Sequence, residues 1–310
     1  MIKSLAITLI VINFMMLSFV DVIFGSDEAN KKEWNSVSAG PVTTWTSPLC
    51  GKDKFVIQPL LFYNRTRGSF DSGGHYSSLP DGERKYQFQE QLFMQYGITD
   101  KLEIDAQTVY QENYIRQNGS SAHVNGFGDS YLFLRYCAFE EKDRLPHLTA
   151  LAQLKIPSGK YQHADPNKLG TDLMGAASGG GSWDDGFGFN LTKKVKPFLF
   201  HADAIYSSPR KVMVDGVKAI YGKYLNYDFG VEYFLLNNFN LMLEANGFLQ
   251  GDKWQDGTRT PSTSLEYLTI ASGVGWSCDK AQLLLAYQRV VSGVNTDAND
   301  SVVLTAVYTF

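Results

Sequence analysis

The feature of this sequence that most limits its possible folds is a series of segments, each about ten residues long, in which apolar and polar side chains alternate. In residues 85–98, KYQFQEQLFMQYGI, the side chains of Tyr86, Phe88 and Met94 share one face, while Gln87 and Gln89 take the other. A period of two is typical of a β-strand that separates an apolar environment from a polar one. The residues TDK then turn the chain, and the alternation resumes at Leu102, which predicts a hairpin with one continuous apolar face.

The same pattern recurs along the rest of the chain and predicts about twelve strands. A tilted strand needs roughly nine to eleven residues to cross a bilayer, which matches these segments, whereas the strands of an exported β-sandwich are usually about five or six residues long. Because a sheet can cross a membrane only when it closes on itself, the sequence predicts an all-β fold, a transmembrane antiparallel β-barrel. The strands are expected to begin near Phe55 and to occupy residues 85–98, 102–107, 128–139, 147–156, 185–191, 197–206, 224–234, 240–249, 265–276, 282–291 and 301–310.

Short and long connections alternate between these segments. The short ones read GITDK, EEKDRLP, LTKKVKP, LLNNFN and SCDKA. In bacterial outer-membrane barrels, short turns face the periplasm and long loops face the cell exterior, and an even number of strands puts both termini in the periplasm. The connections expected to be long, most of them rich in Gly, Ser, Asp and Asn, lie near residues 65–84, 112–126, 157–181, 207–222, 250–263 and 292–299.

The N-terminal part divides into two regions before the barrel. Residues 1–25 place Lys3 before an apolar stretch that ends near Gly25, a pattern typical of a secretory signal peptide; a retained membrane anchor is the alternative. Residues 26–52 are polar at first and contain Pro41 and Pro48, which predicts a periplasmic tail whose second half tucks into the barrel. The barrel itself is expected to cover residues 53–310.

The last segment, SVVLTAVYTF, places Val302, Leu304, Tyr308 and Phe310 on one face. Because a barrel has no free edge, this strand must pair with the first, and its apolar row must face hydrocarbon. An ending with Tyr308 and a terminal Phe310 also resembles the assembly signal of bacterial outer-membrane barrels. We therefore expect the outer-membrane bilayer and the barrel-assembly machinery as partners of the chain.

The polar face of the strands is the candidate functional surface, because polar side chains inside a barrel either solvate a channel or form a hydrogen-bonded plug. Acidic side chains outnumber basic ones on this face, which predicts a weak preference for cations. The predicted pore-lining residues are Gln87, Gln89, Gln91, Glu103, Asp105, Gln107, Arg135, Lys155, His201, Asp203, Asp228, Glu232, Glu244, Gln282 and Gln288.

Large apolar side chains share that inner face and should narrow the pore. Eight strands nearly fill their own interior, and sixteen leave an open channel, so about twelve strands with bulky inner residues predict a partly occluded passage suited to a small amphipathic solute. The residues concerned are Phe93, Tyr131, Phe133, Leu151, Leu199, Phe234, Met242 and Phe248.

Composition argues against several other functions. Lys and Arg number 28 against 32 Asp and Glu, and no basic run forms a phosphate-contacting stripe, so a nucleic-acid partner is not expected. Cys50, Cys137 and Cys278 form no metal-binding pair, and buried or interfacial free thiols are expected, although pairing of two of them stays open. The sequence contains no phosphate-binding glycine loop or catalytic motif, so neither a cofactor nor a metal is predicted.

Several stretches resemble a family of bacterial outer-membrane proteins described as transporters of the meta-pathway of phenol degradation. The resemblance rests on GFGDSYLFLRY at 126–136, LKIPSGKY at 154–161, GSWDDGFGFNL at 181–191 and YQRVVSGVN at 287–295, and it extends from about residue 53 to the C-terminus. The sequence departs from the family where GTDLMGAASGG separates Gly170 and Thr171 from the Ser-Trp-Asp that begins at Ser182. The resemblance implies a passive outer-membrane channel for small aromatic or apolar solutes and supplies no catalytic residue.

Two other functions remain open at the level of sequence. His201 and Asp203 lie two residues apart and could form an acid/base pair in an outer-membrane lipid hydrolase, although no catalytic serine motif accompanies them and an ordinary lumen histidine is the favoured interpretation. Alternatively, the long loops, above all residues 162–180, could bind a partner as a surface adhesin while the barrel only anchors them.

Overall fold

The computed structural model describes residues 38, 40–117, 119–142, 144–159, 180–214, 217–236, 238–278 and 280–310. The predicted signal peptide and the first part of the predicted tail lie outside these residues, as does nearly all of the 162–180 loop. No helix in the described ranges is long and apolar enough to cross a membrane.

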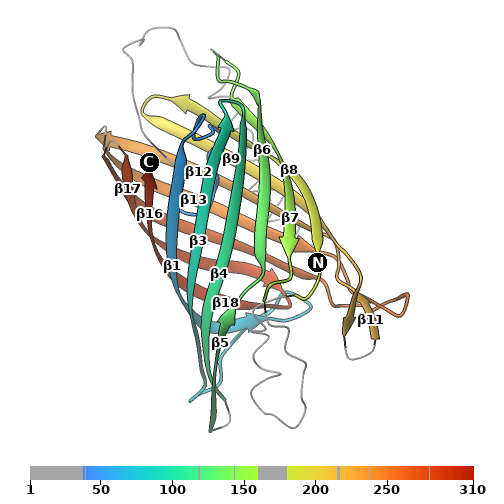
Figure 1. Cartoon of the computed structure of the whole chain (residues 1–310). Helices are drawn as coiled ribbons and strands as arrows, with labels where there is room; N and C mark the ends of the chain where they lie inside the picture. Colours follow the sequence, from blue (N-terminus) through green and yellow to red (C-terminus); the bar gives the residue numbers. More distant parts are fainter. Residues whose placement is uncertain are drawn as a thin grey trace.

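A closed antiparallel barrel forms the body of the molecule (Figure 1). Each wall strand pairs with its neighbours in chain order, and the last pairs with the first through contacts such as Leu61 opposite Leu304. In the described ranges the wall has twelve strands, as the sequence predicts. They are β1 (Phe55–Phe70), β3 (Arg84–Thr99), β4 (Leu102–Gln117), β6 (Ser130–Phe139), β7 (His147–Ile156), β8 (Asp184–Val195), β9 (Phe198–Pro209), β12 (Tyr224–Leu236), β13 (Phe239–Gln250), β16 (Leu265–Cys278), β17 (Ala281–Val294) and β18 (Thr296–Thr309).

Several strands are longer than the alternation predicts, and three expected loops are shorter. β1 extends to Phe70, and β4 pairs with β5 (Ser120–Phe127) over most of the expected 112–126 loop. Between β17 and β18, Asn295 alone makes the turn where a longer loop is expected, with a left-handed φ of 51°. A strand of 16 residues is about 50 Å long, about twice the membrane band of roughly 25 Å. Outside the bilayer, strand pairing continues without alternation of apolar and polar side chains, because backbone hydrogen bonds do not depend on the side-chain pattern.

β5 and β6 together act as one wall strand with a break. β4 pairs with β5 from Tyr110 onward and with β6 up to Gln107, and the chain leaves the ladder only around Gly128 and Asp129. Two small additions lie outside the wall. β2 (Tyr76–Ser78) folds back on the end of β1, and a four-stranded sheet joins the connections β9–β12 and β13–β16, at the lower right in Figure 1. Its strands are β10 (Val212–Val214), β11 (Val217–Ile220), β14 (Trp254–Gln255) and β15 (Thr258–Arg259).

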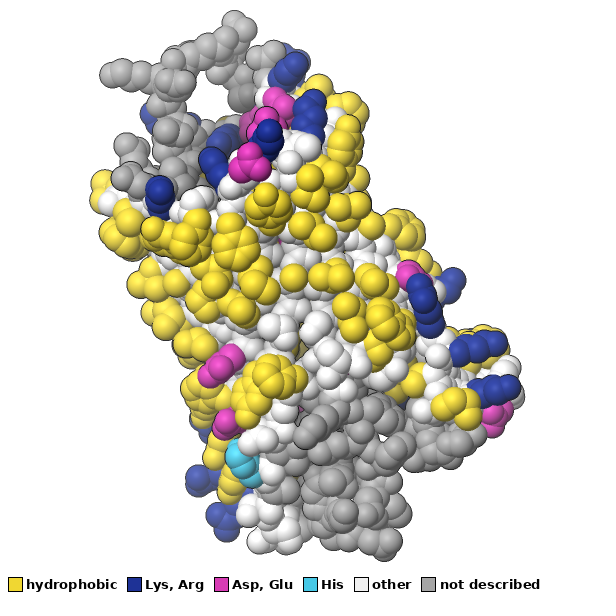
Figure 2. All heavy atoms as spheres, viewed as in Figure 1, with side chains coloured by type: hydrophobic (Ala, Val, Ile, Leu, Met, Phe, Trp, Pro, Cys, Tyr) yellow, Lys and Arg dark blue, Asp and Glu magenta, His cyan; other side chains and the backbone are white. Residues whose placement is uncertain are grey.

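The two faces of the wall differ as the alternation requires. Large apolar side chains such as Leu243, Leu283 and Trp276 point outward and are exposed. On the face shown in Figure 2, apolar side chains cover much of the middle of the barrel, while most charged groups lie toward its ends. The inner face is not uniformly polar. Val303 and Val307 of β18 point inward and pack in an apolar cluster with Leu60 of β1.

Candidate functional site: the barrel interior

The segment from Gly40 to Cys50, which precedes β1, lies inside the barrel. Its end at Cys50 bonds Glu103 near the barrel end that carries the short turns, and its tip, around Val42 and Trp45, reaches the middle of β13 and β9. We call residues 40–50 the inner segment. It belongs to no strand, and side chains of the wall bond its backbone instead.

Glu244 of β13 is the main anchor of the inner segment. Its carboxylate accepts hydrogen bonds from the backbone N–H groups of Val42, Thr43 and Thr44 and from both threonine hydroxyls, at 2.7–3.0 Å. Hydrogen bonds to a charged acceptor are shorter and stronger than neutral ones. Five donors on one carboxylate therefore make Glu244 the residue on which the position of the tip most depends.

Further wall residues bond the rest of the segment. Asp203 accepts from the Trp45 N–H at 2.9 Å, and Glu103 accepts from the Cys50 N–H at 2.6 Å. Arg135, itself paired with Glu103 at 2.8 Å, donates to the carbonyl oxygen of Thr46 at 2.5 Å. These side chains thus bond backbone groups of the inner segment that would otherwise be buried without partners.

Two glycines of the wall let the inner segment and the adjoining Gly51 approach closely. A Cβ added at Gly97 of β3 would lie 1.9 Å from the carbonyl oxygen of Gly51, and a Cβ at Gly230 of β12 would lie 2.7 Å from the ring of Pro41. Neither approach is possible with any other residue at these positions unless the backbone or ring moves. The wall is therefore shaped for this segment at two separate points.

Trp45 divides the interior into two cavities. Its ring packs against Phe93 at 5.1 Å and Phe133 at 4.7 Å, and the Arg135 guanidinium lies 5.4 Å from its centroid. Trp45 lines an outer cavity of about 590 Å³, toward the long loops, and also an inner cavity of about 260 Å³ between the segment and the wall. This single side chain is part of the floor that separates them.

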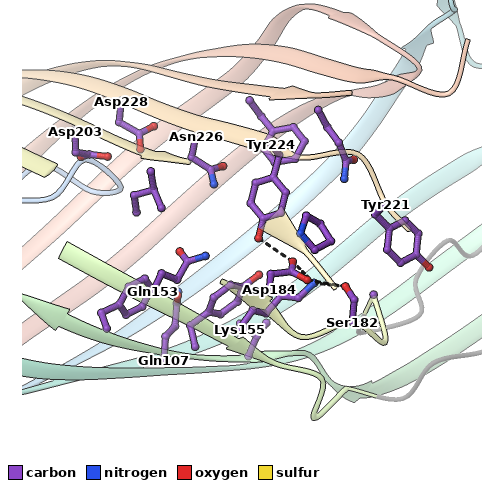
Figure 3. Close-up of a pocket in the computed structure, with 18 of the residues that line it drawn as sticks. Gln107, Gln153, Lys155, Ser182, Asp184, Asp203, Tyr221, Tyr224, Asn226 and Asp228 are labelled. Carbon is purple, nitrogen blue, oxygen red and sulfur yellow. Dashed lines mark hydrogen bonds and ion pairs between the residues drawn. The ribbon is translucent and has the colours of Figure 1, made fainter. Parts of the chain in front are cut away.

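The outer cavity combines aromatic walls with polar groups (Figure 3). Its aromatic surface comes from Tyr131, Phe133, Tyr224, Phe248 and Tyr267, of which Phe248 and Tyr267 stack at 5.2 Å. Its volume suits a ligand of modest size, because ligand pockets commonly occupy about 300–1,000 Å³. The polar residues on its wall are Gln89, Gln91, Gln107, Gln153, Lys155, Ser182, Asp184, Asp203, Asn226, Asp228 and Gln250.

The charges around the outer cavity are distributed unevenly. The amino group of Lys155 lies 2.6 Å from Asp184, and the Tyr224 hydroxyl donates to the same carboxylate at 3.0 Å, as the dashed lines in Figure 3 show. Asp203 and Asp228 lie apart from this pair, with no basic side chain within ion-pair distance in the described ranges. The one lysine of the cavity is thus paired locally, whereas the acidic groups Asp203 and Asp228 have no basic partner there.

All fifteen predicted pore-lining residues point into the barrel, but some line the outer cavity and others are buried in contacts within the protein. Gln89, Gln91, Gln107, Lys155, Asp203 and Asp228 line the outer cavity, while Glu103, Arg135, Glu232 and Glu244 are buried around the inner segment. Asp105 is also buried, 3.7 Å from Arg135, and Gln87 bonds Asn64 and Asn113 near the loop end. Gln282 and Gln288 of β17 are buried.

The bulky inner residues also fall into two groups. Phe93, Leu151, Leu199, Phe234 and Met242 are buried away from the outer cavity, and Tyr131, Phe133 and Phe248 line it. The passage is therefore narrowed by side chains and blocked in its middle by the inner segment.

His201 does not form the hypothesised pair with Asp203. Its Nε2 lies 2.9 Å from Glu232, and its Nδ1 lies 3.1 Å from the hydroxyl of Thr192. All of these groups are buried beneath the inner segment, and none lines either cavity. The geometry supports a structural role for His201 rather than a hydrolase site, which requires access for a substrate.

Sequence reasoning missed Trp45 and Asp184 as residues of the site. Trp45 belongs to a segment without periodicity, so no pattern indicates its position. Asp184 precedes the alternation of Gly186, Gly188 and Asn190 by two residues and shares their inward face, so extending that strand backward could have found it. The three cysteines are unpaired in the structure, and the described ranges contain no cluster of side chains able to hold a metal ion.

Known proteins share this architecture. The structure resembles the crystal structure of an outer membrane channel from Pseudomonas putida F1 with a TM-score of 0.67 and 15% identity, over 91% of this chain and 100% of that chain. The NanC porin (TM-score 0.47, 10% identity, 81% and 98% of the chains) and the monoaromatic hydrocarbon channel CymD (0.45, 9%, 84% and 89%) also match. The first likeness shows that the fold is that of an outer-membrane barrel. No curated protein matches the sequence significantly.

The sequence itself gives the family. Residues 72–305 match the model of the family of the MetA-pathway of phenol degradation, and this range covers most of the barrel. The motifs quoted above from residues 126–136, 154–161, 181–191 and 287–295 lie within it. This chain, an outer-membrane β-barrel, belongs to the family of the MetA-pathway of phenol degradation.

Proposed function

We propose that the protein is a passive outer-membrane channel for small solutes that carry an aromatic or apolar body. The observation that carries this proposal is the outer cavity of about 590 Å³, whose aromatic walls can pack against such a body while its amide and carboxylate groups bond a polar substituent. The names of the relatives agree with this function, because one is an outer membrane channel and another a monoaromatic hydrocarbon channel.

The proposal includes an orientation. The long connections face the cell exterior and the short turns face the periplasm, as in other outer-membrane barrels, so both termini are periplasmic. A solute enters the outer cavity from the cell surface, and the inner segment closes the path on the periplasmic side. The terminal pair Tyr308 and Phe310 serves as the signal that the assembly machinery recognises.

Passage to the periplasm requires the inner segment to shift. Trp45 is the part of that segment that faces both cavities, so its movement is the smallest change that would join them. Because the cavities are narrow and acidic side chains outnumber the single lysine around the outer one, we expect small currents and a weak preference for cations.

Single-channel recording of the refolded mature protein in a planar bilayer tests this function. We expect small discrete steps, a reversal potential of the cation-selective sign in a salt gradient, and block when benzylammonium is added on the loop side. Trp45→Ala should enlarge the steps because it removes the ring between the cavities. Trp276→Ala is the matched control, since Trp276 points outward from β16.

Three results would contradict the proposal. Folded protein that never conducts, with or without the Trp45 substitution, would exclude a channel. Equal currents from both tryptophan variants would show that Trp45 does not limit passage. An anion-selective reversal potential would refute the expected cation preference.

A further inference from the structure

A second kind of site lies on the outer surface of the barrel, away from the interior. A cavity of about 630 Å³ opens between the loop-side ends of β1 and β3 and the connection that joins β2 to β3. Arg65, Arg67 and Arg84 line it, with Tyr63 and Tyr86 beneath them. Thr66 and Lys85, the latter paired with Asp297, also line it, and the connection supplies the rest of the wall through residues 79–83, which include Asp81 and Glu83.

Two of these arginines are left without a bond partner. In the part of the chain that the structure describes, neither Arg65 nor Arg84 forms a hydrogen bond or ion pair through its side chain, and both are exposed. Arg84 also lies directly opposite Arg116 of β4, and both point outward. Like charges at directly opposed positions of a sheet destabilise it, so an anion bound here would stabilise this part of the wall.

A third arginine is held in place by the protein itself. Arg67 donates to the carbonyl oxygen of Val290 at 2.5 Å, lies 3.4 Å from Asp300 and stacks over Tyr76 at 5.0 Å. Asp300 is already bound in bidentate fashion by Arg289, at 2.7 and 2.9 Å. Arg67 is therefore oriented in advance, and the carboxylate beside it is shared between two guanidinium groups.

The surface below the arginines is aromatic and then aliphatic. Tyr86 stacks on Tyr114 at 4.6 Å, and Tyr63 contacts Phe88 at 5.8 Å. All four rings point outward, and exposed Leu61 follows them toward the middle of the barrel. Tyrosine rows of this kind mark the level at which the bilayer meets water. The arginine cavity thus lies at headgroup height, directly above a surface that contacts acyl chains.

From this arrangement we propose that the cavity binds the phosphate groups of a phosphorylated glycolipid of the outer leaflet, of the lipid A type, with its acyl chains along the aromatic and aliphatic surface below. Guanidinium groups match phosphate oxygens in paired hydrogen bonds, and the unpartnered arginines supply the charge. A zwitterionic phospholipid offers less net charge to the same groups. The proposal uses the orientation given above, in which the long connections face the cell exterior, but it does not require the channel to conduct.

Native mass spectrometry of the detergent-solubilised protein measures this binding. The probes are diphosphoryl lipid A, phosphatidylethanolamine and inorganic phosphate, each titrated separately. We expect lipid A to bind at least about tenfold more tightly than phosphatidylethanolamine, a difference of about 1.4 kcal/mol. The double variant Arg65→Gln with Arg84→Gln should lose that difference.

The matched control is Arg210→Gln with Arg259→Gln. It removes the same charge at the loop end, but from exposed arginines that are already paired with Asp185 and Asp252. It should bind lipid A as the wild type does. Equal affinity of the wild type for both lipids, an equal loss in the two double variants, or binding of inorganic phosphate without preference for lipid A would overturn the proposal.

The lipid-binding experiment can be interpreted independently of the single-channel recording that tests the proposed function. Neither Arg65 nor Arg84 faces the interior, so single-channel conductance of the Arg65→Gln, Arg84→Gln variant should match that of the wild type. Loss of lipid A binding with normal conductance supports the glycolipid site. A protein that binds lipid A but never conducts would support the site and refute the channel.

Discussion

At the scale of single residues, the interior of this barrel is organised by carboxylates that bond backbone N–H groups. Glu244 holds the tip of the inner segment, Asp203 holds Trp45, and Glu103 holds Cys50. Five donors surround the carboxylate of Glu244, and that of Glu103 also pairs with the Arg135 guanidinium. These three residues thus fix a segment that has no secondary structure of its own.

Replacing Glu244 by Gln should loosen the inner segment. The amide removes the negative charge and turns one acceptor oxygen into a donor that faces other donors, which we expect to cost about 2 kcal/mol, or roughly a 30-fold rise in the population of released segment. Single-channel recording should show more frequent or larger openings. Glu90→Gln is the charge-matched control, because Glu90 is exposed on the outside of β3, and it should leave the openings unchanged.

Unchanged openings in Glu244→Gln, with the barrel folded, would show that other contacts suffice to hold the segment. An equal increase in Glu90→Gln would assign the effect to net charge rather than to the anchor.

At the scale of elements, the loop between β13 and β16 shows how a long connection is kept ordered. Asp252 binds Arg259 through its carboxylate at 2.8 Å and accepts the backbone N–H groups of Thr263 and Ser264 at 2.9 and 2.8 Å. The hydrogen bond from Arg259, followed by those from Thr263 and Ser264, lowers the pKa of Asp252 below its ordinary value. One side chain therefore joins the two ends of the loop.

This loop should lose its order in acid. The pKa of Asp252 is lowered because its ionised form is bonded in the folded loop. The ionised carboxylate therefore stabilises the loop fully above the ordinary carboxyl pKa, and this stabilisation is lost as the pH falls through the lowered value. The amide resonances of Thr263 and Ser264, followed by NMR in micelles, should shift with a midpoint below about 3.9, the ordinary value for aspartate. Asp252→Asn should abolish this titration, whereas Asp81→Asn, on a different loop, should retain it. A midpoint at or above the ordinary value would contradict the expectation.

At the scale of the whole molecule, the barrel closes because its last strand, β18, pairs with its first, β1. β18 pairs with β1 over nearly the full length of both strands, and the N–H of Phe310 donates to the carbonyl oxygen of Phe55 at 2.9 Å. The ring of Phe310 lies 4.8 Å from Tyr308 and 5.8 Å from Phe55, and it stays mostly exposed. Its packing alone contributes little to stability, which leaves recognition during assembly as its proposed role.

Phe310→Ala should therefore lower the yield of assembled barrel more than its contacts alone explain. The backbone hydrogen bond to Phe55 is kept, so the variant tests the ring. Heat modifiability on gel electrophoresis of outer membranes measures the folded fraction. Phe127→Ala is the control, since Phe127 has the same exposed fraction of 62% and also packs on one tyrosine, Tyr110. Equal yields from the two variants would refute a special role for the terminal ring.

The sequence alone predicted the type of fold, the number of wall strands and the inward direction of all fifteen candidate residues, because a period of two sets the face of each side chain once one face must contact lipid. It also indicated the family through local motifs. It did not predict the ends of β1, β4 and β17, since outside the bilayer nothing requires the alternation that marked them.

Only the tertiary structure decided what the inner residues do. Alternation states that Glu244, Asp203 and Gln107 point inward, but not that Glu244 bonds the inner segment while Gln107 lines a cavity. That difference depends on where a segment without periodicity comes to lie, and its position is set by donors and acceptors far apart in the chain. The tertiary structure likewise decides the arginine cavity, because Arg65 and Arg84 line one cavity only when β1 and β3 lie side by side.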